Sequence, residues 1–412
     1  MTNLMTKDPS QSQHQPLAPS EKLFNRGIMT TLNAQFFSAF ADNALFFALM
    51  ELISHGSYGK EAIYILQGTF VIFYILLAPF VGHVADNLAK SHVLMIGNGI
   101  KIIGVLLLFA GISPFICYAI VGLGAAIYSP AKFGVLSEFV STKLLIKANG
   151  LVEGSTIVAI LSGAALGGIL AEKGVGYAIA LTTVCYLLAL LFNLFIPKIA
   201  PKRKDPFNPL KIAGQFTELL KKLFNDKRAR FAILGTSLFW AGVAVLKLLL
   251  NDWVRDVLGQ GTEKVSELSV IVGVGVILGS AIAAIWIEQK NIKISLYAGF
   301  GMSFTVLLFL LADNLLMAYG ALLFVGIFGG AFLIPLNALL QERGGLLQNT
   351  GTAIAIQNLF ENLCMLIAIA FFGYLASIGT LSIILLMGLF AALFCLCVLG
   401  LFIYIRSAKV FD

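Results

Sequence analysis

Residues 35–47 read QFFSAFADNALFF and lie in the middle of the first long apolar segment, roughly residues 28–53. An ionised carboxylate at the centre of a membrane span costs roughly 2.5–3.5 kcal/mol on insertion scales, so a helix must turn it toward other helices or a watered cavity. Helical spacing places four polar residues on one broad face: Gln35, Ser38, Asp42 and Asn43. We expect this face to bind substrate or an ion. In the alternative interpretation, Asp42 pairs with a buried cation and only holds the helices together.

The composition indicates a membrane protein. Of the 412 residues, 59% are hydrophobic and only 12% are charged, and the mean hydropathy is +0.92. A soluble globular domain needs many more charges on its surface. The net charge of +7 is no sign of nucleic acid binding, because the distribution of charge among loops matters more in a membrane protein.

A membrane-spanning helix needs about 20 apolar residues, and twelve segments satisfy this. These segments are 28–53, 62–86, 92–112, 114–137, 147–172, 176–197, 230–254, 266–287, 292–312, 314–340, 349–374 and 379–405. We therefore predict an all-α polytopic protein with both termini on one side. Of the 28 Lys and Arg residues, 21 fall on the side of the termini and four on the other, which predicts cytoplasmic termini.

The long loop between the sixth and seventh segments divides the chain into two halves. The expected parts are a disordered cytoplasmic tail (1–27), a six-helix half (28–197), a cytoplasmic linker (198–229), a second six-helix half (230–405) and a short cytoplasmic tail (406–412). Apolar residues at helical spacing predict a basic amphipathic helix in the linker, which would lie on the anionic inner leaflet. A plain solvated linker is the alternative.

The two halves repeat one another. Residues 122–130 (GLGAAIYSP) match residues 326–335 (GIFGGAFLIP) with one insertion, and an acid follows each proline, Glu138 and Glu342. Two parallel six-helix halves joined by a cytoplasmic loop form the architecture of major facilitator transporters, with the substrate site between the halves.

The loop between the second and third segments supports this architecture. Residues 82–92 read GHVADNLAKSH and resemble the G-x-x-x-D-R/K-x-x-R/K loop of the major facilitator superfamily. In that motif the glycine lets two helices approach, and the charges form a latch on one conformation. We therefore assign Gly82, Asp86 and Lys90 to gating, together with Glu138, Glu342 and Arg343 at the ends of the repeated segments.

Charged residues inside the predicted spans form a second set of candidates. Three are acids and three are bases: Asp42, Glu153, Glu361, Lys101, Lys132 and Lys247. Equal numbers favour pairing, which lowers the cost of insertion. We expect Lys101 and Glu153 to form a structural ion pair. Lys132 and Lys247 are cations that can meet a phosphate, and Glu361 lies in an unusually polar stretch with Gln357 and Asn358.

Several motifs together resemble the bacterial lysophospholipid transporter family. They are QFxSAFxDNALxFA (35–48), APFVGxVAD (78–86), YSPAKxG (128–134), GTSLFW (235–240) and PLNALLQERG (335–344). The resemblance implies alternating access and inward flipping of lysophospholipids, chiefly lysophosphatidylethanolamine, across the bacterial inner membrane. It also implies a separate cytoplasmic acyltransferase/acyl-carrier-protein synthetase that restores the missing chain. One departure is Lys247, where the family more typically has Arg.

This implied substrate suits the predicted charges. A zwitterionic headgroup offers an ammonium to Asp42 or Glu361 and a phosphate to Lys132 or Lys247. The acyl tail needs an apolar route, for which we expect an opening at the side of the protein. A coupling cation, sodium or a proton, is the other role open to Asp42, with Asn43 and Gln35 as further oxygen ligands.

Enzyme motifs are absent from the sequence. It contains no Walker loop, no glycine-rich nucleotide fingerprint, no serine elbow and no H-x4-D acyltransferase motif. We therefore expect a protein that is not an enzyme and has no cofactor. Two other functions stay open: an ion-coupled exporter of amphipathic drugs, and a membrane scaffold or receptor whose charges are purely structural.

Overall fold

The computed structural model describes residues 20–54, 56, 62–201, 204–259, 262–312, 314–378 and 381–411. Residues 1–19 of the predicted tail lie outside this part. The first helix begins at Arg26, slightly before the expected end of the tail.

The N-terminal half is built from helices of very different length. They are α1 (Arg26–Ser54), α2 (Ala62–Leu76), α3 (Ala78–Asn87), α4 (Lys90–Phe109), α5 (Pro114–Phe139), α6 (Leu145–Lys173) and α7 (Val175–Leu194). A short 3-10 helix, η1 (Thr142–Leu144), precedes α6. The break between α2 and α3 is a bend of 62°. Pro79 stands in the first turn of α3, where the missing N–H and the proline ring prevent a continuous helix.

The C-terminal half follows the linker helix α8 (Pro209–Asn225). It consists of α9 (Lys227–Asp256), α10 (Thr262–Trp286), α11 (Ser295–Leu310), α12 (Leu315–Leu346), α13 (Thr350–Ser377) and α14 (Ile383–Ser407), with the 3-10 helix η2 (Gln289–Ile294) before α11. In the described residues, eleven helices are long and apolar enough to cross a membrane, and the bent pair α2–α3 supplies a twelfth span. The predicted twelve-span, all-α fold class is confirmed.

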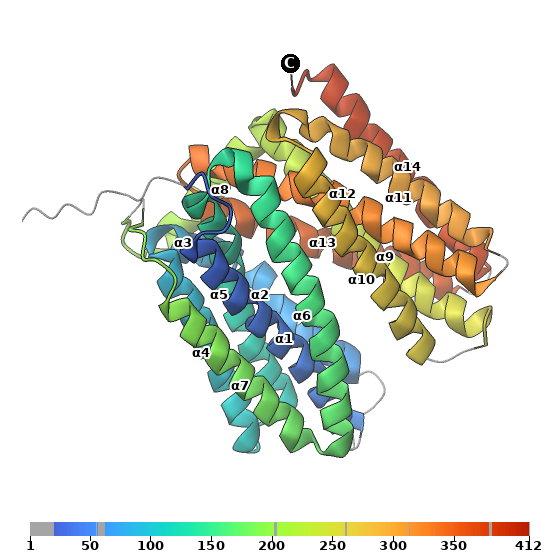
Figure 1. Cartoon of the computed structure of the whole chain (residues 1–412), viewed down its shortest axis with the longest axis horizontal. Coiled ribbons are helices and arrows are strands. Elements are labelled where there is room, and N and C mark those ends of the chain that lie inside the picture. Colours follow the sequence, from blue (N-terminus) through green and yellow to red (C-terminus); the bar gives the residue numbers. More distant parts are fainter. Residues whose placement is uncertain are drawn as a thin grey trace, which may run out of the picture.

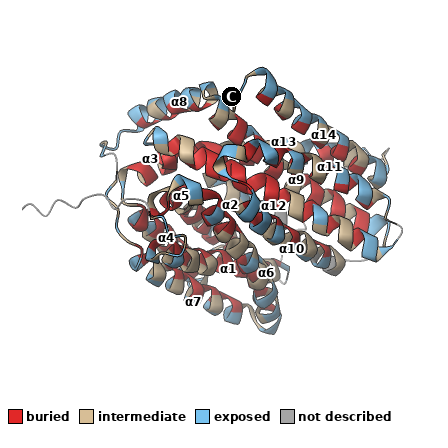
Figure 2. Ribbon diagram, turned by 45° about the horizontal axis from the view of Figure 1, so that its top comes forward, coloured by how far each residue is buried: buried red, intermediate tan, exposed pale blue. Residues whose placement is uncertain are grey.

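The two halves form separate helix bundles that lie close together at the end carrying α8 and diverge toward the other end (Figure 1). Buried residues gather where helices face one another, whereas the outer faces are largely exposed (Figure 2). Many exposed residues on these outer faces are large and apolar, including Ile103, Phe109, Leu191, Phe304, Leu316, Ile367 and Leu396. Such an apolar exterior is suited to contact with lipid.

The repeat in the sequence is also a repeat in packing. Gly122 of α5 lies directly against the backbone of Phe70 in α2, and Gly326 of α12 lies against the backbone of Val272 in α10. A Cβ at either glycine would overlap the carbonyl oxygen opposite. The second and fourth spans of each half therefore cross at equivalent glycines.

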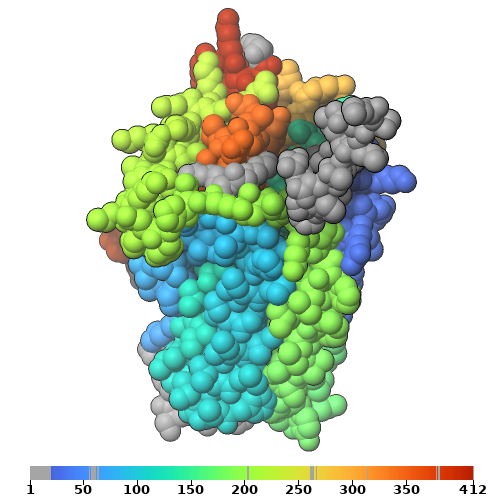
Figure 3. All heavy atoms as spheres, turned by 90° about the vertical axis from the view of Figure 1, so that its left-hand side faces the viewer, coloured from blue at the N-terminus to red at the C-terminus, as the bar shows by residue number. Residues whose placement is uncertain are grey.

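The linker contains the predicted amphipathic helix, but the apolar face of this helix is not placed as either interpretation of the sequence expects. Its apolar residues Ile212, Phe216, Leu219 and Leu223 are buried, and α8 packs on α3, α9 and α13. The protein, and neither lipid nor solvent, covers this face. Figure 3 shows the yellow-green linker lying across the molecule between the blue and cyan helices of the N-terminal half and the orange and red segments of the C-terminal half.

Candidate functional site

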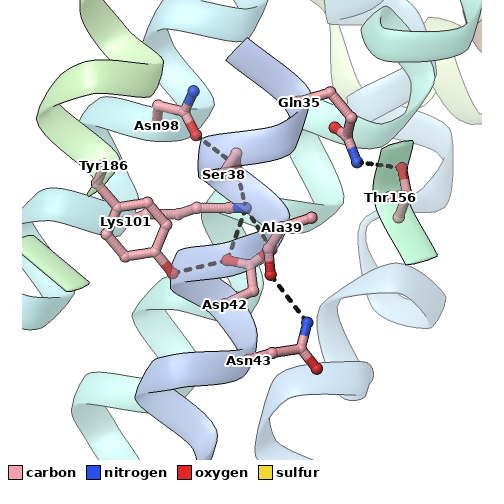
Figure 4. A network of polar contacts seen from close by, with 9 residues as sticks. All are labelled: Gln35, Ser38, Ala39, Asp42, Asn43, Asn98, Lys101, Thr156 and Tyr186. Atoms are coloured by element: carbon pink, nitrogen blue, oxygen red, sulfur yellow. Dashed lines mark hydrogen bonds and ion pairs between the residues drawn. The ribbon is translucent and has the colours of Figure 1, made fainter. Parts of the chain in front are cut away.

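Asp42 of α1 forms an ion pair with Lys101 of α4. The ammonium of Lys101 lies 2.7 Å from Oδ2 and 2.8 Å from Oδ1, and the hydroxyl of Tyr186 in α7 donates to Oδ1 at 2.6 Å (Figure 4). Lys101 is almost completely buried, whereas the side chain of Asp42 keeps 21% of its surface exposed. Three helices of the N-terminal half, α1, α4 and α7, therefore meet at an ion pair whose net charge is zero. One side of the Asp42 carboxylate stays accessible.

The remaining contacts of Lys101 explain its burial. Its ammonium donates to the hydroxyl of Ser38 at 3.0 Å, and Ser38 in turn donates to the amide oxygen of Asn98 at 2.8 Å. The ammonium also lies 5.3 Å from the ring centre of Tyr128 and 5.6 Å from that of Tyr186. Hydrogen bonds and aromatic faces both stabilise a desolvated cation.

The predicted pair of Lys101 with Glu153 is therefore wrong. The long stem of Lys101 carries its ammonium to Asp42 instead, and the charge that acts on Glu153 of α6 is that of Lys132. Spacing along a helix does not give distances between helices, so sequence alone could not choose between the two acids.

Gln35 and Asn43 of α1 turn away from Asp42, whereas Ser38 shares the Lys101 ammonium with it. The amide of Gln35 donates to Thr156 of α6 at 3.1 Å, and the amide of Asn43 donates to the carbonyl of Ala39 at 2.9 Å (Figure 4). The expected set of oxygen ligands from Gln35, Asp42 and Asn43 is thus not assembled around one point. Among the residues that the structure describes, no group of three or more His, Cys, Asp or Glu could hold a metal ion.

A second polar cluster lies in the C-terminal half around Glu361 of α13. The amide of Gln357 donates to Glu361 at 2.8 Å and to Asn337 of α12 at 2.7 Å, and Thr236 of α9 also contacts Glu361. Glu361 is buried, with 7% of its surface exposed. No ion pair reaches it from any part of the chain that the structure describes, so its carboxyl group has hydrogen-bond partners but no cation in contact.

Lys132 of α5 lies where the halves meet. Its ammonium sits over the ring of Phe133 at 4.1 Å, and the acids whose charges act on it include Glu153 of α6 and Glu361 of α13. One helical turn earlier, Ser129 accepts a hydrogen bond at 2.9 Å from Asn358 of α13. Within the described ranges no carboxylate forms an ion pair with Lys132, which leaves this cation available to a ligand.

Lys247 of α9 is exposed, and no described residue forms an ion pair with it. Helical spacing puts it on the same face as Thr236, which contacts Glu361. Lys247 therefore belongs to the face of α9 that carries the Glu361 cluster, nearer the other end of the helix. The structure does not pair it with Asp42, although the two occupy corresponding spans.

Asp86 joins the two halves at the end that carries α8. Its carboxylate accepts hydrogen bonds from the N–H groups of Gly351 and Thr352 at 2.7 and 2.8 Å, and from the hydroxyl of Thr352 at 2.7 Å. These groups form the first turn of α13, where a helix N-terminus favours an anion. Gly82 lies against the Cα of Thr352, so a side chain at this position would push the helices apart.

The other residues assigned to gating hold each half together internally. Lys90 pairs with Glu138 across α4 and α5, and Gln289 of η2 donates to Glu342 of α12 at 2.6 Å. Arg343 pairs with Asp226, which also caps α9 by accepting from the N–H groups of Arg228 and Ala229. Although burial raises the pKa of Asp226, the hydrogen bonds from Arg343 and from this backbone hold it below its usual value.

The loop departs from the superfamily motif at Asn87, and this departure has a structural counterpart. Asn87, which stands where a basic residue is more common, accepts a hydrogen bond at 2.6 Å from the backbone N–H of Asp205 in the linker. Phe207 of the linker packs against Phe80 and His83 of α3. The motif loop thus binds the linker at the same end where Asp86 binds α13.

A lateral groove runs between the halves on the outer surface. It has a volume of about 570 Å³ and is lined mainly by apolar residues of α1, α6 and α10, among them Leu32, Val158 and Ile277. Gly154 widens it, and the exposed Lys147 lies at the end nearest η1. The implied substrate predicts an opening at the side of the protein without placing it. The sequence does not predict Tyr186 or Asp226 as partners, because hydroxyls and caps in or beside apolar segments carry little signal.

Comparison with known proteins gives concordant matches. Residues 31–363 match the family model of the Major Facilitator Superfamily. A lysophospholipid transporter of Yersinia enterocolitica serotype O:8 is 44% identical over 359 residues, which cover 87% of this chain and 89% of that protein. A lysophospholipid transporter of Yersinia pestis strain Pestoides F is 42% identical over 367 residues, covering 89% and 90%.

A solved structure matches the fold at much lower identity. The fucose:proton symporter of Escherichia coli superposes with a TM-score of 0.73 at 13% identity, covering 92% of this chain and 98% of that one. This likeness bears on the arrangement of the helices alone.

Proposed function

Because the chain belongs to the Major Facilitator Superfamily, we propose that this multi-pass membrane protein is a lysophospholipid transporter that works by alternating access. The observation that carries the proposal is that two side chains of opposite charge type, without an ion pair to any described residue, stand where the halves meet. Lys132 comes from one half and Glu361 from the other, and neither has an ion-pair partner among the described residues. The relatives named as lysophospholipid transporters, which cover most of the chain, support the same substrate class.

A zwitterionic headgroup suits these charges. Its phosphate meets Lys132, with Lys247 as a second cation, and its ammonium meets Glu361 or the exposed edge of Asp42. Unpaired charges are costly in a membrane, so a ligand carrying both signs satisfies the site better than one carrying either. A headgroup held by both halves would also link binding to their relative movement.

The single acyl tail needs an apolar path beside the headgroup. The lateral groove between α6 and α10 offers one, and Lys147 at its end can face a phosphate at the membrane surface. We propose that the lipid enters from the side and moves inward across the bacterial inner membrane, with both termini in the cytoplasm. A separate cytoplasmic acyltransferase/acyl-carrier-protein synthetase would then restore the missing chain.

A coupling cation, either sodium or a proton, is part of the proposal. The oxygens of Asp42 already accept from Lys101 and Tyr186, so Glu361, which has no ion-pair partner among the described residues, is the better candidate for such a cation. Glu361 therefore has two candidate roles: it meets the ammonium of the headgroup, or it binds the coupling cation.

Reconstituted transport separates these roles. Purified protein in liposomes should move labelled lysophosphatidylethanolamine to the inner leaflet, where a membrane-impermeant quencher cannot reach the label. If Glu361 meets the ammonium, Glu361→Gln should lower transport of this lipid at least about tenfold and spare lysophosphatidylglycerol, which has no ammonium. If Glu361 binds a cation, both lipids should fall alike, and dependence on sodium or pH should disappear. The matched control is Glu288→Gln, an exposed acid paired with Lys290. Absence of protein-dependent protection in the wild type would refute the proposed function.

A further inference from the structure

One buried contact between the halves lies outside the candidate headgroup site. The amide of Asn149 in α6 donates to the amide oxygen of Gln341 in α12 at 2.9 Å, and Gln341 donates back to Asn149 at 2.7 Å. Asn149 is 1% exposed and Gln341 is 2% exposed. The two residues are 192 positions apart and belong to opposite halves.

The surroundings leave this pair well satisfied. The second N–H of the Asn149 amide donates to the carbonyl of Leu145 at 2.9 Å, so both of its donors are used. The next residue, Gly150, lies against the backbone of Ser280 in α10, where an added Cβ would come within 3.1 Å of the carbonyl oxygen. At this level α6 thus touches α12 and α10 together, and the halves cannot separate without parting both contacts.

We propose that the reciprocal Asn149–Gln341 pair is a second latch of the closed gate at the α8 end, separate from the Asp86 latch. The proposal rests on the proposed function, because alternating access requires the halves to part at this end. Separation exchanges two protein hydrogen bonds for hydration, and the pair therefore favours the closed state. Because both side chains are neutral, this latch does not depend on pH, unlike the carboxylate of Asp86.

The latch can be measured without any lipid substrate. Spin labels on cysteines at Lys143 and Lys290, exposed positions within η1 and η2, report the distance between the halves at this end in a background without the native cysteines. Asn149→Ala and Gln341→Ala should each raise the ratio of open to closed protein about 5- to 30-fold, and the double variant should add little more. Gln341→Met keeps the volume and should act like Gln341→Ala.

Exchange of the two side chains is the decisive variant. Asn149→Gln with Gln341→Asn keeps two facing amides and should return the distance distribution toward that of the wild type. The control is Asn193→Ala, a buried amide of α7 with no hydrogen-bond partner in the described residues, which should leave the distribution unchanged. Unchanged distances in the single variants would overturn the proposal, as would an exchange that fails to restore closure. The distance measurement uses no lipid, so it tests the latch alone. Absence of lysophospholipid transport in liposomes would refute the proposed function and leave these distances unchanged.

Discussion

Replacing Lys101 with methionine should destabilise the N-terminal half far more than replacing Lys101 and Asp42 together. In the single variant, Asp42 keeps the hydrogen bond from Tyr186 and loses its only ion-pair partner among the described residues. Removing one partner of a buried pair costs about 3–5 kcal/mol, and the partial exposure of Asp42 puts the expected loss near the lower limit, about 3 kcal/mol.

The double variant Lys101→Met with Asp42→Asn should behave differently. The new amide can still accept from Tyr186 and carries no charge, so no uncompensated ion remains. Exchanging a whole buried pair for neutral groups is often close to neutral, and we expect a net loss within about 1 kcal/mol. The coupling energy from the full cycle should therefore be large.

Reversible unfolding in mixed micelles, followed by circular dichroism, gives the four free energies of unfolding. Circular dichroism is the better probe because all three tryptophans, Trp240, Trp253 and Trp286, lie in the C-terminal half. Lys290→Met, which removes an exposed cation paired with Glu288, serves as the control and should show no measurable change. If the single and double variants lose the same free energy, the unpaired carboxylate is not the cause of the loss, and our reasoning about the pair fails.

Two further predictions concern the end that carries α8. Asp86→Asn should slow transport and leave binding of lysophospholipid largely intact, because the carboxylate of Asp86 contacts the start of α13 and lies outside the candidate headgroup site. Equal losses in a binding assay and a flux assay would contradict this. The low pKa of Asp226 means that its ion pair with Arg343 stabilises the protein above the carboxyl's usual pKa of about 3.9, and that this stability is lost as pH falls through the lowered value. The difference in thermal stability between wild type and Asp226→Asn should thus be constant from pH 5 to 7 and shrink below pH 4. A constant difference at every pH would show that the ion pair between Asp226 and Arg343 does not stabilise the protein.

The parts of the fold that could be predicted from sequence are those set by local pattern. Apolar length predicts each span, and the repeat of residues 122–130 in residues 326–335 has a counterpart in the packing of Gly122 and Gly326. The Gly82–Asp86 spacing likewise predicts a close helix approach beside a carboxylate, which α13 supplies.

Distances between helices could not be predicted in the same way. Lys101 reaches Asp42 and not Glu153 because its stem extends across the bundle, and nothing in the sequence measures that gap. The linker shows a related limit. A hydrophobic face on α8 indicates that something covers it, yet Phe216 and its neighbours pack on protein, where lipid was an equally sound expectation.

The pairing of Asp42 with Lys101 has a consequence for the electrical behaviour of the protein. Moving one elementary charge through the membrane field is worth about 2.3 kcal/mol per 100 mV. Both members of this pair belong to the same half and lie 2.7 Å apart, so any rigid movement of that half carries them together. Their contributions cancel, and Lys101, the most deeply buried of the described lysines, adds nothing to the gating charge of the cycle.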